Sequence, residues 1–389
     1  MNVPKLRFKE FNDEWLIFPL NKIVKFSKGN LLSKADLDDE GLYPCILYGQ
    51  LYTKYSEVIR NIFSKTNRND KNLILSKYGD ILIPSSGETP IDISTSSCVM
   101  VENVILGGDI NILSPVNCDG RFLSYMINNN KKKEIAKVAQ GHSVVHLYND
   151  NLKKINVNIP SLTEQTKIAN TLELLDKKIE LQTKKIEDLK LFKKGLIKDI
   201  FSADNLKSVY IKDLGTVITG TTPSKDNKNY WDNGFIAWIT PTDITYDRDI
   251  STSITSLTEV GLDKGRYVPK NSVLVTCIAS IGKNAVLKVD GSCNQQINAI
   301  IPNNNYKSNY IYYLMEYISP YLQSIAGTSA TAIVNKETFE NVKVNVHSFS
   351  EQLKIDKYLS SIESKILLEY KLLNKLFELK KGLMQNMFV

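Results

Sequence analysis

The chain has 389 residues, a net charge of +7, 42% apolar residues and 23% charged residues. This length allows two or three domains with their own cores, and the composition is ordinary for a soluble globular protein. No run of about 18 apolar residues is present, so we expect no membrane span. The N-terminal segment MNVPKLRFKEF lacks the apolar stretch of a secretory signal. Five scattered cysteines without a Cys-x-x-Cys pair indicate reduced thiols and a cytoplasmic location.

Residues 1–160 show short apolar runs broken by Gly, Pro, Asn and Asp, a texture typical of strands and turns. Two segments, Arg121–Asn128 and Lys131–Ala139, are predicted to be helical. We therefore expect one mixed globular domain here. The strand-like runs are Leu73–Leu75, Ile81–Ile83, Val99–Leu106 and Ile110–Leu113.

Residues 161–203 carry apolar side chains at alternating steps of three and four, which predicts one long coiled-coil helix. The apolar seam is broken by two polar residues, Gln182 and Lys193. Its members are Ile168, Leu172, Leu175, Ile179, Gln182, Ile186, Leu189, Lys193, Leu196 and Ile200.

Residues 204–347 repeat the strand-and-turn texture and predict a second globular domain. Strand-like stretches are Phe235–Thr240, Ser272–Ile278 and Ala285–Val289. Ser308–Ile325 is predicted to be a helix that is interrupted at Pro320.

Residues 348–389 repeat the long helix. Glu351–Phe388 aligns without a gap to Glu164–Phe201 at a shift of 187 residues and is identical at 15 of 38 positions. Its seam is broken at Glu369 and Lys380, the places that match Gln182 and Lys193. Its members are Ile355, Leu359, Ile362, Ile366, Glu369, Leu373, Leu376, Lys380, Leu383 and Met387.

The similarity extends into the globular regions, where Ile110-Asn111 matches Ile297-Asn298 at the same shift. The predicted fold class is therefore α+β (α/β mixed). Two similar globular domains are expected to be separated by two long helices that form an antiparallel, pseudo-twofold coiled coil. In the register that we expect, Lys193 faces Glu369 and Gln182 faces Lys380, since polar pairs in an apolar seam can fix a register.

The usual catalytic motifs are missing from the sequence. There is no G-x-x-x-x-G-K-[ST] loop, no Asn-Pro-Pro-Tyr/Phe motif and no Gly-rich cofactor loop after a strand. Asp213 with Asp226-Asn227-Lys228 resembles a metal-dependent nuclease pattern, but it has no counterpart in the first half. His142 and His146 lie in a β-branched stretch where a spacing of four is no helical face, so a polar loop is favoured over a metal site. We expect a chain without catalysis or metal.

Several segments resemble the specificity (S, HsdS) subunits of type I restriction–modification systems, over nearly the whole chain. The first half departs from the pattern, because Gly29 is not followed by Thr-Pro. The segments that carry the resemblance are Pro4-Lys5-Leu6-Arg7-Phe8, Gly220-Thr221-Thr222-Pro223-Ser224, Tyr230-Trp231, Trp238-Ile239-Thr240 with Asp243, Cys277–Lys283 and Asn294–Ala299.

The resemblance implies a division of labour. Each globular domain is a target recognition domain that reads one half of a bipartite sequence in double-stranded DNA. The helices set the spacer between the half-sites and dock two modification (methyltransferase) subunits, and restriction (translocase/nuclease) subunits complete the complex. S-adenosylmethionine, ATP and Mg are then expected on the partner subunits, and no cofactor is expected on this chain.

Base reading requires side chains that reach groove depth from loops. Hydroxyl, amide and basic residues in candidate loops are therefore the predicted DNA contacts, although small residues of this kind also simply form turns. The candidates in the second domain are Thr221, Thr222, Ser224, Ser280, Lys283, Gln295, Thr328 and Ser329. The candidates in the first domain are Arg60, Arg68, Lys71, Ser85, Ser86, His142, Ser143 and His146.

Two other functions remain open at this point. A structural coiled-coil protein would explain the helices but not the paired globular domains. A self-contained DNA methyltransferase or nuclease would methylate or cleave DNA without another subunit.

Overall fold

The computed structural model describes residues 3–141, 143–326 and 332–389. The chain divides into two compact units. Unit 1 contains Met1–Leu181 and Leu373–Val389, and unit 2 contains Gln182–Leu372. The two long helices, α5 (Leu162–Phe201) and α10 (Phe349–Met387), each contribute one part to each unit.

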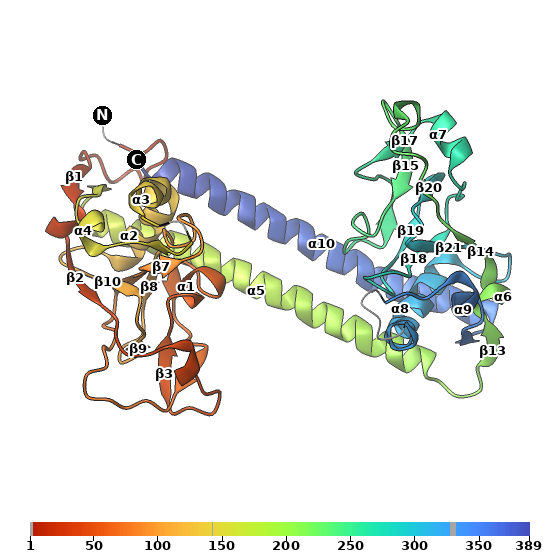
Figure 1. Cartoon of the computed structure of the whole chain (residues 1–389), viewed down its shortest axis with the longest axis horizontal. Coiled ribbons are helices and arrows are strands. Elements are labelled where there is room, and N and C mark those ends of the chain that lie inside the picture. The colour runs from red at the N-terminus through yellow and green to blue at the C-terminus, as the bar shows by residue number, and fades with distance from the viewer. Residues whose placement is uncertain (1–2, 142, 327–331) are drawn as a thin grey trace. The chain divides into compact units, whose positions relative to one another are not determined.

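The strands of unit 1 form a central five-stranded sheet and smaller sheets beside it (Figure 1). They are β1 (Leu16–Pro19), β2 (Val24–Lys28), β3 (Tyr43–Ile46), β4 (Val58–Ile59), β5 (Ser64–Thr66), β6 (Asp80–Pro84), β7 (Ser86–Gly87), β8 (Ser97–Val99), β9 (Ile105–Leu106), β10 (Ile110–Pro115), β11 (Val145–His146) and β12 (Asn156–Ile159). The central order is β2-β10-β6-β8-β4, a second sheet has the order β5-β3-β9, and β1 pairs with β12 and β7 with β11.

The helices of unit 1 lie around these sheets. They are α1 (Gln50–Thr53), α2 (Gly120–Met126), α3 (Lys132–Val138) and α4 (Asn149–Leu152), and a π-helical turn joins α2 to α3. The Asp119 carboxylate caps α2 by accepting hydrogen bonds from the first free N–H groups of the helix.

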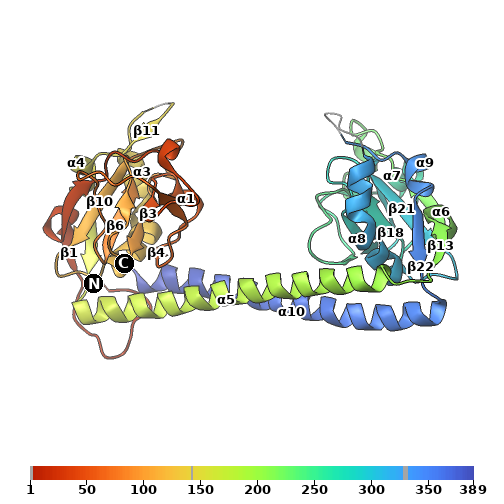
Figure 2. The ribbon, with the colours of Figure 1, turned by 90° about the horizontal axis from the view of Figure 1, so that it is seen from below.

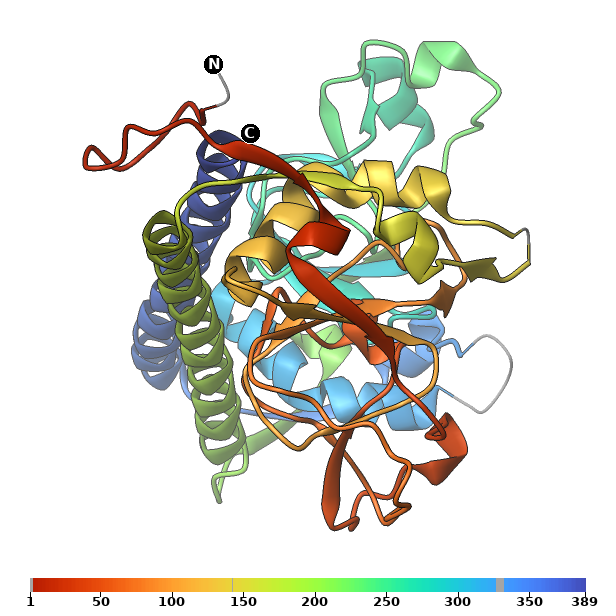
Figure 3. The same cartoon turned by 90° about the vertical axis from the view of Figure 1, so that its left-hand side faces the viewer.

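The core of unit 1 includes residues from both ends of the chain. Trp15 and Phe122 pack with Met387 and Phe388 in one buried cluster. Figure 3 shows the start of α5 beside the end of α10, and both helix ends contribute buried residues to this cluster. The C-terminal segment is therefore a part of the first globular core.

Unit 2 has the same kinds of element. The strands are β13 (Lys207–Tyr210), β14 (Gly215–Thr219), β15 (Ile236–Ile239), β16 (Asp249–Ile250), β17 (Ser256–Leu257), β18 (Val273–Thr276), β19 (Asn284–Leu287), β20 (Gly291–Cys293), β21 (Ile297–Pro302) and β22 (Lys343–Val346). The helices are α6 (Ile211–Leu214), α7 (Glu259–Lys264), α8 (Ser308–Ile325) and α9 (Lys336–Glu340). Helix α8 covers one face of the central sheet (Figure 2).

The two units share one sheet topology. The orders β14-β21-β18-β19-β16 and β17-β15-β20 of unit 2 match β2-β10-β6-β8-β4 and β5-β3-β9 of unit 1. Even the parallel pairs correspond, since β3 pairs with β9 as β15 pairs with β20, and β4 with β8 as β16 with β19. The predicted mixed fold with two similar globular domains is confirmed.

Three local predictions were wrong, and one of them is Val99–Leu106, of which only Val99 and Ile105–Leu106 lie in strands. Helix α8 continues through Pro320 instead of stopping there, because its many buried side chains hold the helix although proline removes one backbone donor. Leu73–Leu75 forms no strand, and only Leu75 makes an isolated bridge, to Ile105.

The predicted pairing of Lys193 with Glu369 was also wrong. Within unit 2, Gln182 Nε2 donates to Glu369 Oε2 at 2.7 Å and to the Glu369 carbonyl at 2.9 Å. Lys193 instead pairs with Glu363 at 2.5 Å. Since Lys193 follows Gln182 while Glu363 precedes Glu369, the helix segments of unit 2 run antiparallel. Lys380 finds its partners, Glu57 and Asp176, within unit 1.

The physical reason lies in the repeat itself. A heptad seam looks the same after a shift by whole helical turns, so the sequence pattern fixes the buried face but not the register. Carboxylates from the globular parts also compete for the lysines. Lys193 bonds to Glu316 of α8 at 2.8 Å, a partner that helix periodicity does not reveal.

Candidate nucleic-acid interface

Unit 2 holds the loop Gly220–Ser224 tightly against its sheet. A Cβ at Gly220 would lie 2.2 Å from the Asn294 carbonyl oxygen, so only glycine allows this approach. The Trp238 indole N–H donates to the Thr221 carbonyl at 3.0 Å, and the Trp231 indole N–H donates to the Ser224 carbonyl at 2.9 Å. The two indoles thus fix the backbone of the loop.

A hollow of about 610 Å³ lies beside this loop. The Thr222 hydroxyl bonds to the exposed Gln295 at 2.5 Å on its rim. The Thr240 hydroxyl donates to the Asp243 carboxylate at 2.6 Å. The lining residues are Thr222, Lys225, Trp238, Thr240, Pro241, Thr242, Asp243, Ile254, Thr255, Asn294, Gln295 and Gln296.

The lining of this hollow is suited to hydrogen bonding rather than to acid–base chemistry. Hydroxyl and amide groups of the kind found at Thr222 and Gln295 can bond to base edges, and a lysine such as Lys225 can meet phosphate. No DNA contact was predicted from the sequence for Lys225, Thr240 or Thr242. Their position next to the Thr-Pro-Ser and Trp-Ile-Thr segments was the available signal.

The loop from Cys277 to Lys283 carries the next candidates. Gly282 has φ +85°, and a Cβ there would lie 2.1 Å from the Ser319 hydroxyl. Lys283 is exposed, but it lines a different hollow, together with Lys190 and Lys194 of α5. The structure therefore does not bring Lys283 to the hollow of Thr222 and Gln295. Ser280 is half-buried in the same loop, and Thr328 and Ser329 lie outside the described residues.

Ser85 and Ser86 in unit 1 are buried, each 4% exposed. Ser86 pairs with His146 across β7 and β11, and the Ser85 carbonyl accepts from the Leu147 N–H at 2.9 Å. Their side chains therefore do not lie on a surface that DNA can reach, and the two serines position the segment that carries His146.

Lys28, His146 and Tyr148 are exposed next to each other on unit 1 and form one surface. The His146 ring stacks near the Tyr148 ring with centroids 6.2 Å apart, and Lys28 Nζ lies 5.9 Å from the same ring. Ser143 is exposed in the adjoining loop, and His142 lies outside the described residues. A cation with exposed rings can contact phosphate and bases. Lys28 and Tyr148 were missed by the sequence analysis, although Lys28 directly precedes Gly29.

The two candidate arginines of unit 1 already have carboxylate partners. Arg60 pairs with Glu173 of α5, and Arg68 pairs with Asp36 at 2.9 Å and with Asp70 at 2.7 Å. Burial raises the pKa of Glu173, but Arg60 and Arg121 outweigh it and bring this pKa below its usual range. These pairs reduce the positive potential of both arginines, whereas Lys71 is exposed in its loop.

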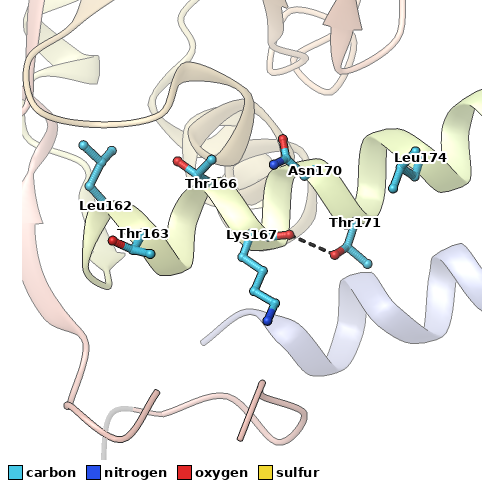
Figure 4. A pocket seen from close by; sticks show the side chains of 7 residues that line it. All are labelled: Leu162, Thr163, Thr166, Lys167, Asn170, Thr171 and Leu174. Atoms are coloured by element: carbon cyan, nitrogen blue, oxygen red, sulfur yellow. Dashed lines mark hydrogen bonds between the residues drawn. The ribbon is translucent and has the colours of Figure 1, made fainter. Parts of the chain in front are cut away.

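A second kind of surface lies on the helices. A hollow follows the first turns of α5 in unit 1, with the exposed Leu162 and Leu174 toward its ends (Figure 4). The Thr171 hydroxyl bonds back to the Lys167 carbonyl at 2.8 Å, so its methyl group adds to the apolar lining. Such a face fits a protein partner better than a nucleic acid.

Neither a metal centre nor a membrane span was found where the chain is described. No group of three or more His, Cys, Asp or Glu residues among the described residues could hold a metal ion. None of the described helices is long and apolar enough to cross a membrane.

Two compact units that share one sheet topology define a tandem-domain protein. The chain belongs to the family of the type I restriction modification DNA specificity domain, whose model matches it twice, over residues 12–191 and 203–378.

Individual relatives agree with this family. The chain is 37% identical over 162 residues to the MjaIX specificity subunit of Methanocaldococcus jannaschii, a stretch that covers 40% of this chain and 37% of that one. A match to the HindI specificity subunit of Haemophilus influenzae is 31% identical over 139 residues and covers 34% and 30%. The matched stretches thus span about a third of these two relatives. A longer match, to the putative MjaX specificity subunit of M. jannaschii, is 21% identical and covers 98% and 95%.

Two solved structures share the fold. The S subunit from M. genitalium has a TM-score of 0.67 at 16% identity, with 100% of this chain and 99% of that chain covered. A chain from a structure of the type I R-M system has a TM-score of 0.58 at 14% identity, with 96% and 97% covered.

Proposed function

We propose that this chain is the DNA-specificity subunit of a type I restriction–modification complex and that each globular unit reads one half of a bipartite duplex target. The observation that carries the proposal is one sheet topology built twice, with Lys28, His146 and Tyr148 exposed in unit 1 and Thr222, Lys225 and Gln295 lining the hollow in unit 2. A sequence made of two different half-sites requires two readers that share a scaffold and differ in their contacts.

Reading in unit 2 takes place at the hollow beside the Gly220–Ser224 loop. Thr222 and Gln295 offer a hydroxyl and an amide to base edges, and Lys225 contacts phosphate. In unit 1 the surface of Lys28, His146 and Tyr148 has the corresponding role. Phosphate contacts fix the position of the duplex, and the base contacts supply the sequence preference.

The helices dock two modification subunits. Exposed apolar residues occur in pairs that differ by 187 positions, with Leu181 (56% exposed) matching Leu368 (65%), and Phe192 (53%) matching Leu379 (51%). Leu181 and Leu379 belong to unit 1, whereas Leu368 and Phe192 belong to unit 2. Two equivalent sets of exposed apolar residues suit two copies of one partner.

The chain itself has no catalytic role in this proposal. The modification subunits supply S-adenosylmethionine and methylate adenine, and restriction subunits supply ATP, Mg and DNA cleavage. The complex acts in the cytoplasm, where the DNA lies.

The test is methylome sequencing of a host that expresses this chain with its modification partner. A single bipartite motif that disappears without the chain is the expected result. Exchanging residues 204–347 for the second domain of another family member should change one half-site and leave the other intact. Methylation by the purified chain alone, or changes in both half-sites, would contradict the proposal.

A further inference from the structure

Each unit contains a lysine that is enclosed by two carboxylates and a tyrosine ring, buried at Lys193 in unit 2 and half-buried at Lys380 in unit 1. In unit 2, Lys193 Nζ lies 2.5 Å from Glu363 and 2.8 Å from Glu316. The same Nζ lies 5.4 Å from the centre of the Tyr312 ring, and the Tyr312 hydroxyl donates to Glu316 at 3.3 Å.

Unit 1 repeats the arrangement around Lys380. Its Nζ lies 2.7 Å from Asp176 and 2.9 Å from Glu57. The Tyr125 ring centre is 5.7 Å away, and the Tyr125 hydroxyl donates to Asp176 at 2.6 Å.

The correspondence holds residue by residue, except at one position. Lys193 and Lys380, Tyr125 and Tyr312, and Asp176 and Glu363 are each 187 positions apart. The remaining acid is different, because Glu316 lies on α8, whereas Glu57 lies in the loop before β4. In each unit the lysine and one acid come from the two long helices, and the other acid and the tyrosine come from the globular part. The cluster therefore bonds the globular part to both helices at once.

Stability alone does not explain such a cluster. A buried ion pair loses its water, so that apolar residues of similar volume are often equally stable. Burial raises the pKa of Asp176 and that of Glu316 despite the nearby lysines. An ion cluster of this kind can define how the globular part sits on the helices, because its charges are all paired only in one geometry.

We propose that the two lysine clusters fix the placement of each globular part on its helices and thereby the spacer length that the complex accepts. This inference rests on the proposed function, since a spacer exists only between two half-sites. Lys193, Lys380, Glu57 and Glu316 are then positioning residues that act on spacing without contacting DNA.

The experiment measures methylation of duplexes that carry the methylome motif with its native spacer, or with a spacer one base pair shorter or longer. The complexes contain the full chain with Lys193→Met or Lys380→Met. Each variant should lower the preference for the native spacer about tenfold, the scale on which positions remote from both sites modulate their coupling. Lys185→Met is the matched control. Lys185 lies on α5, as Lys193 does, and pairs with Glu369 of α10 at 2.6 Å, but its side chain is 52% exposed. This control should leave the preference unchanged.

Glu316→Gln and Glu57→Gln keep the helix pair and remove only the acid of the globular part, so they decide the question if a lysine variant does not fold. A variant that is merely destabilised would lose methylation equally at all spacers. Equal loss at all spacers, or an unchanged spacer preference in all four variants, overturns the inference. The proposed function would still stand in that case, because the wild-type complex would still methylate a bipartite motif. A wild-type complex without a bipartite motif overturns both.

Discussion

Unit 2 is formed by one continuous stretch of chain, whereas unit 1 needs two. The last aromatic residue of each long helix nevertheless fills an equivalent place, with Phe201 buried in unit 2 and Phe388, 187 positions later, buried in unit 1. In unit 1 the Leu6 N–H donates to the Asn386 carbonyl at 2.8 Å, and the Asn158 side chain bonds to Val389 at 3.1 Å. The comparison shows that the C-terminus completes the first domain just as the middle of the chain completes the second.

The largest expected effect tests this equivalence. Phe388→Ala removes a side chain that packs against Phe122 with ring centroids 5.4 Å apart. A buried Phe→Ala change costs about 3–5 kcal/mol, so unit 1 should unfold at a much lower temperature. Phe201→Ala, which removes the contact with Tyr310, should do the same to unit 2.

Calorimetry with limited proteolysis of both variants separates the two units. Each substitution should lower the melting temperature of its own unit and leave the other protected. If Phe388→Ala weakened unit 2 or left unit 1 unchanged, the C-terminus would not be a part of the first core in solution.

Partner docking gives the next effect. Leu181→Glu with Leu379→Glu places charge at the exposed apolar residues of unit 1, and Phe192→Glu with Leu368→Glu does so in unit 2. Since a buried unpaired charge is costly, each double variant should bind one modification subunit instead of two. Native mass spectrometry counts the subunits. Lys198→Glu, an exposed charge change on the same helix, should still bind two, and loss of both subunits from either double variant would contradict two independent sets of docking residues.

A smaller effect tests the difference between the reading surfaces. Trp238→Phe keeps an aromatic ring, though a smaller one, and loses the indole N–H bond to the Thr221 carbonyl, which leaves the Gly220–Ser224 loop less firmly held. We expect about a tenfold loss of affinity, on the scale of one hydrogen bond, confined to the half-site that unit 2 reads. Binding to duplexes mutated in either half-site measures this. Equal loss of preference at both half-sites would mean that the loop does not act locally.

The sequence predicted the parts of this molecule that repeat. The heptad seams predicted the long helices, because local periodicity determines a helix. The repeat at 187 residues predicted the two similar domains, because it extends into the globular regions. The register at Gln182 was not predictable, because whole-turn shifts preserve the seam. The partners of Arg60 and Lys193 lie 113 and 123 residues away and depend on tertiary packing. Ser85 and Ser86 were expected in a surface loop but are buried. The sequence Ser-Ser-Gly does not reveal that β11 pairs with β7 and helps to cover both residues.

The smallest effect concerns His347 of unit 2. The matching position in unit 1, 187 residues earlier, is Pro160. His347 Nδ1 lies 2.9 Å from the Tyr310 hydroxyl, and its ring packs edge-on against Phe201. Burial lowers the pKa of His347 below its usual value of 6.5. The unfolded chain therefore binds a proton more readily than the folded one. The stability that neutral His347 provides is complete above about pH 6.5 and is lost as the pH falls toward the folded pKa.

Unit 2 should accordingly lose stability between pH 7.5 and 5.5 through His347. The melting temperature of the unit 2 transition in the wild type and in His347→Asn measures this loss. Glu316, whose pKa is raised by burial, acts in the opposite direction, but it is present in both proteins and cancels in their difference. The wild type should therefore fall further than the variant on acidification. If the melting temperatures of the wild type and the variant fell in parallel with pH, His347 would be protonated equally in the folded and unfolded states. Burial of His347 against Phe201 would then not make unit 2 more sensitive to pH than unit 1.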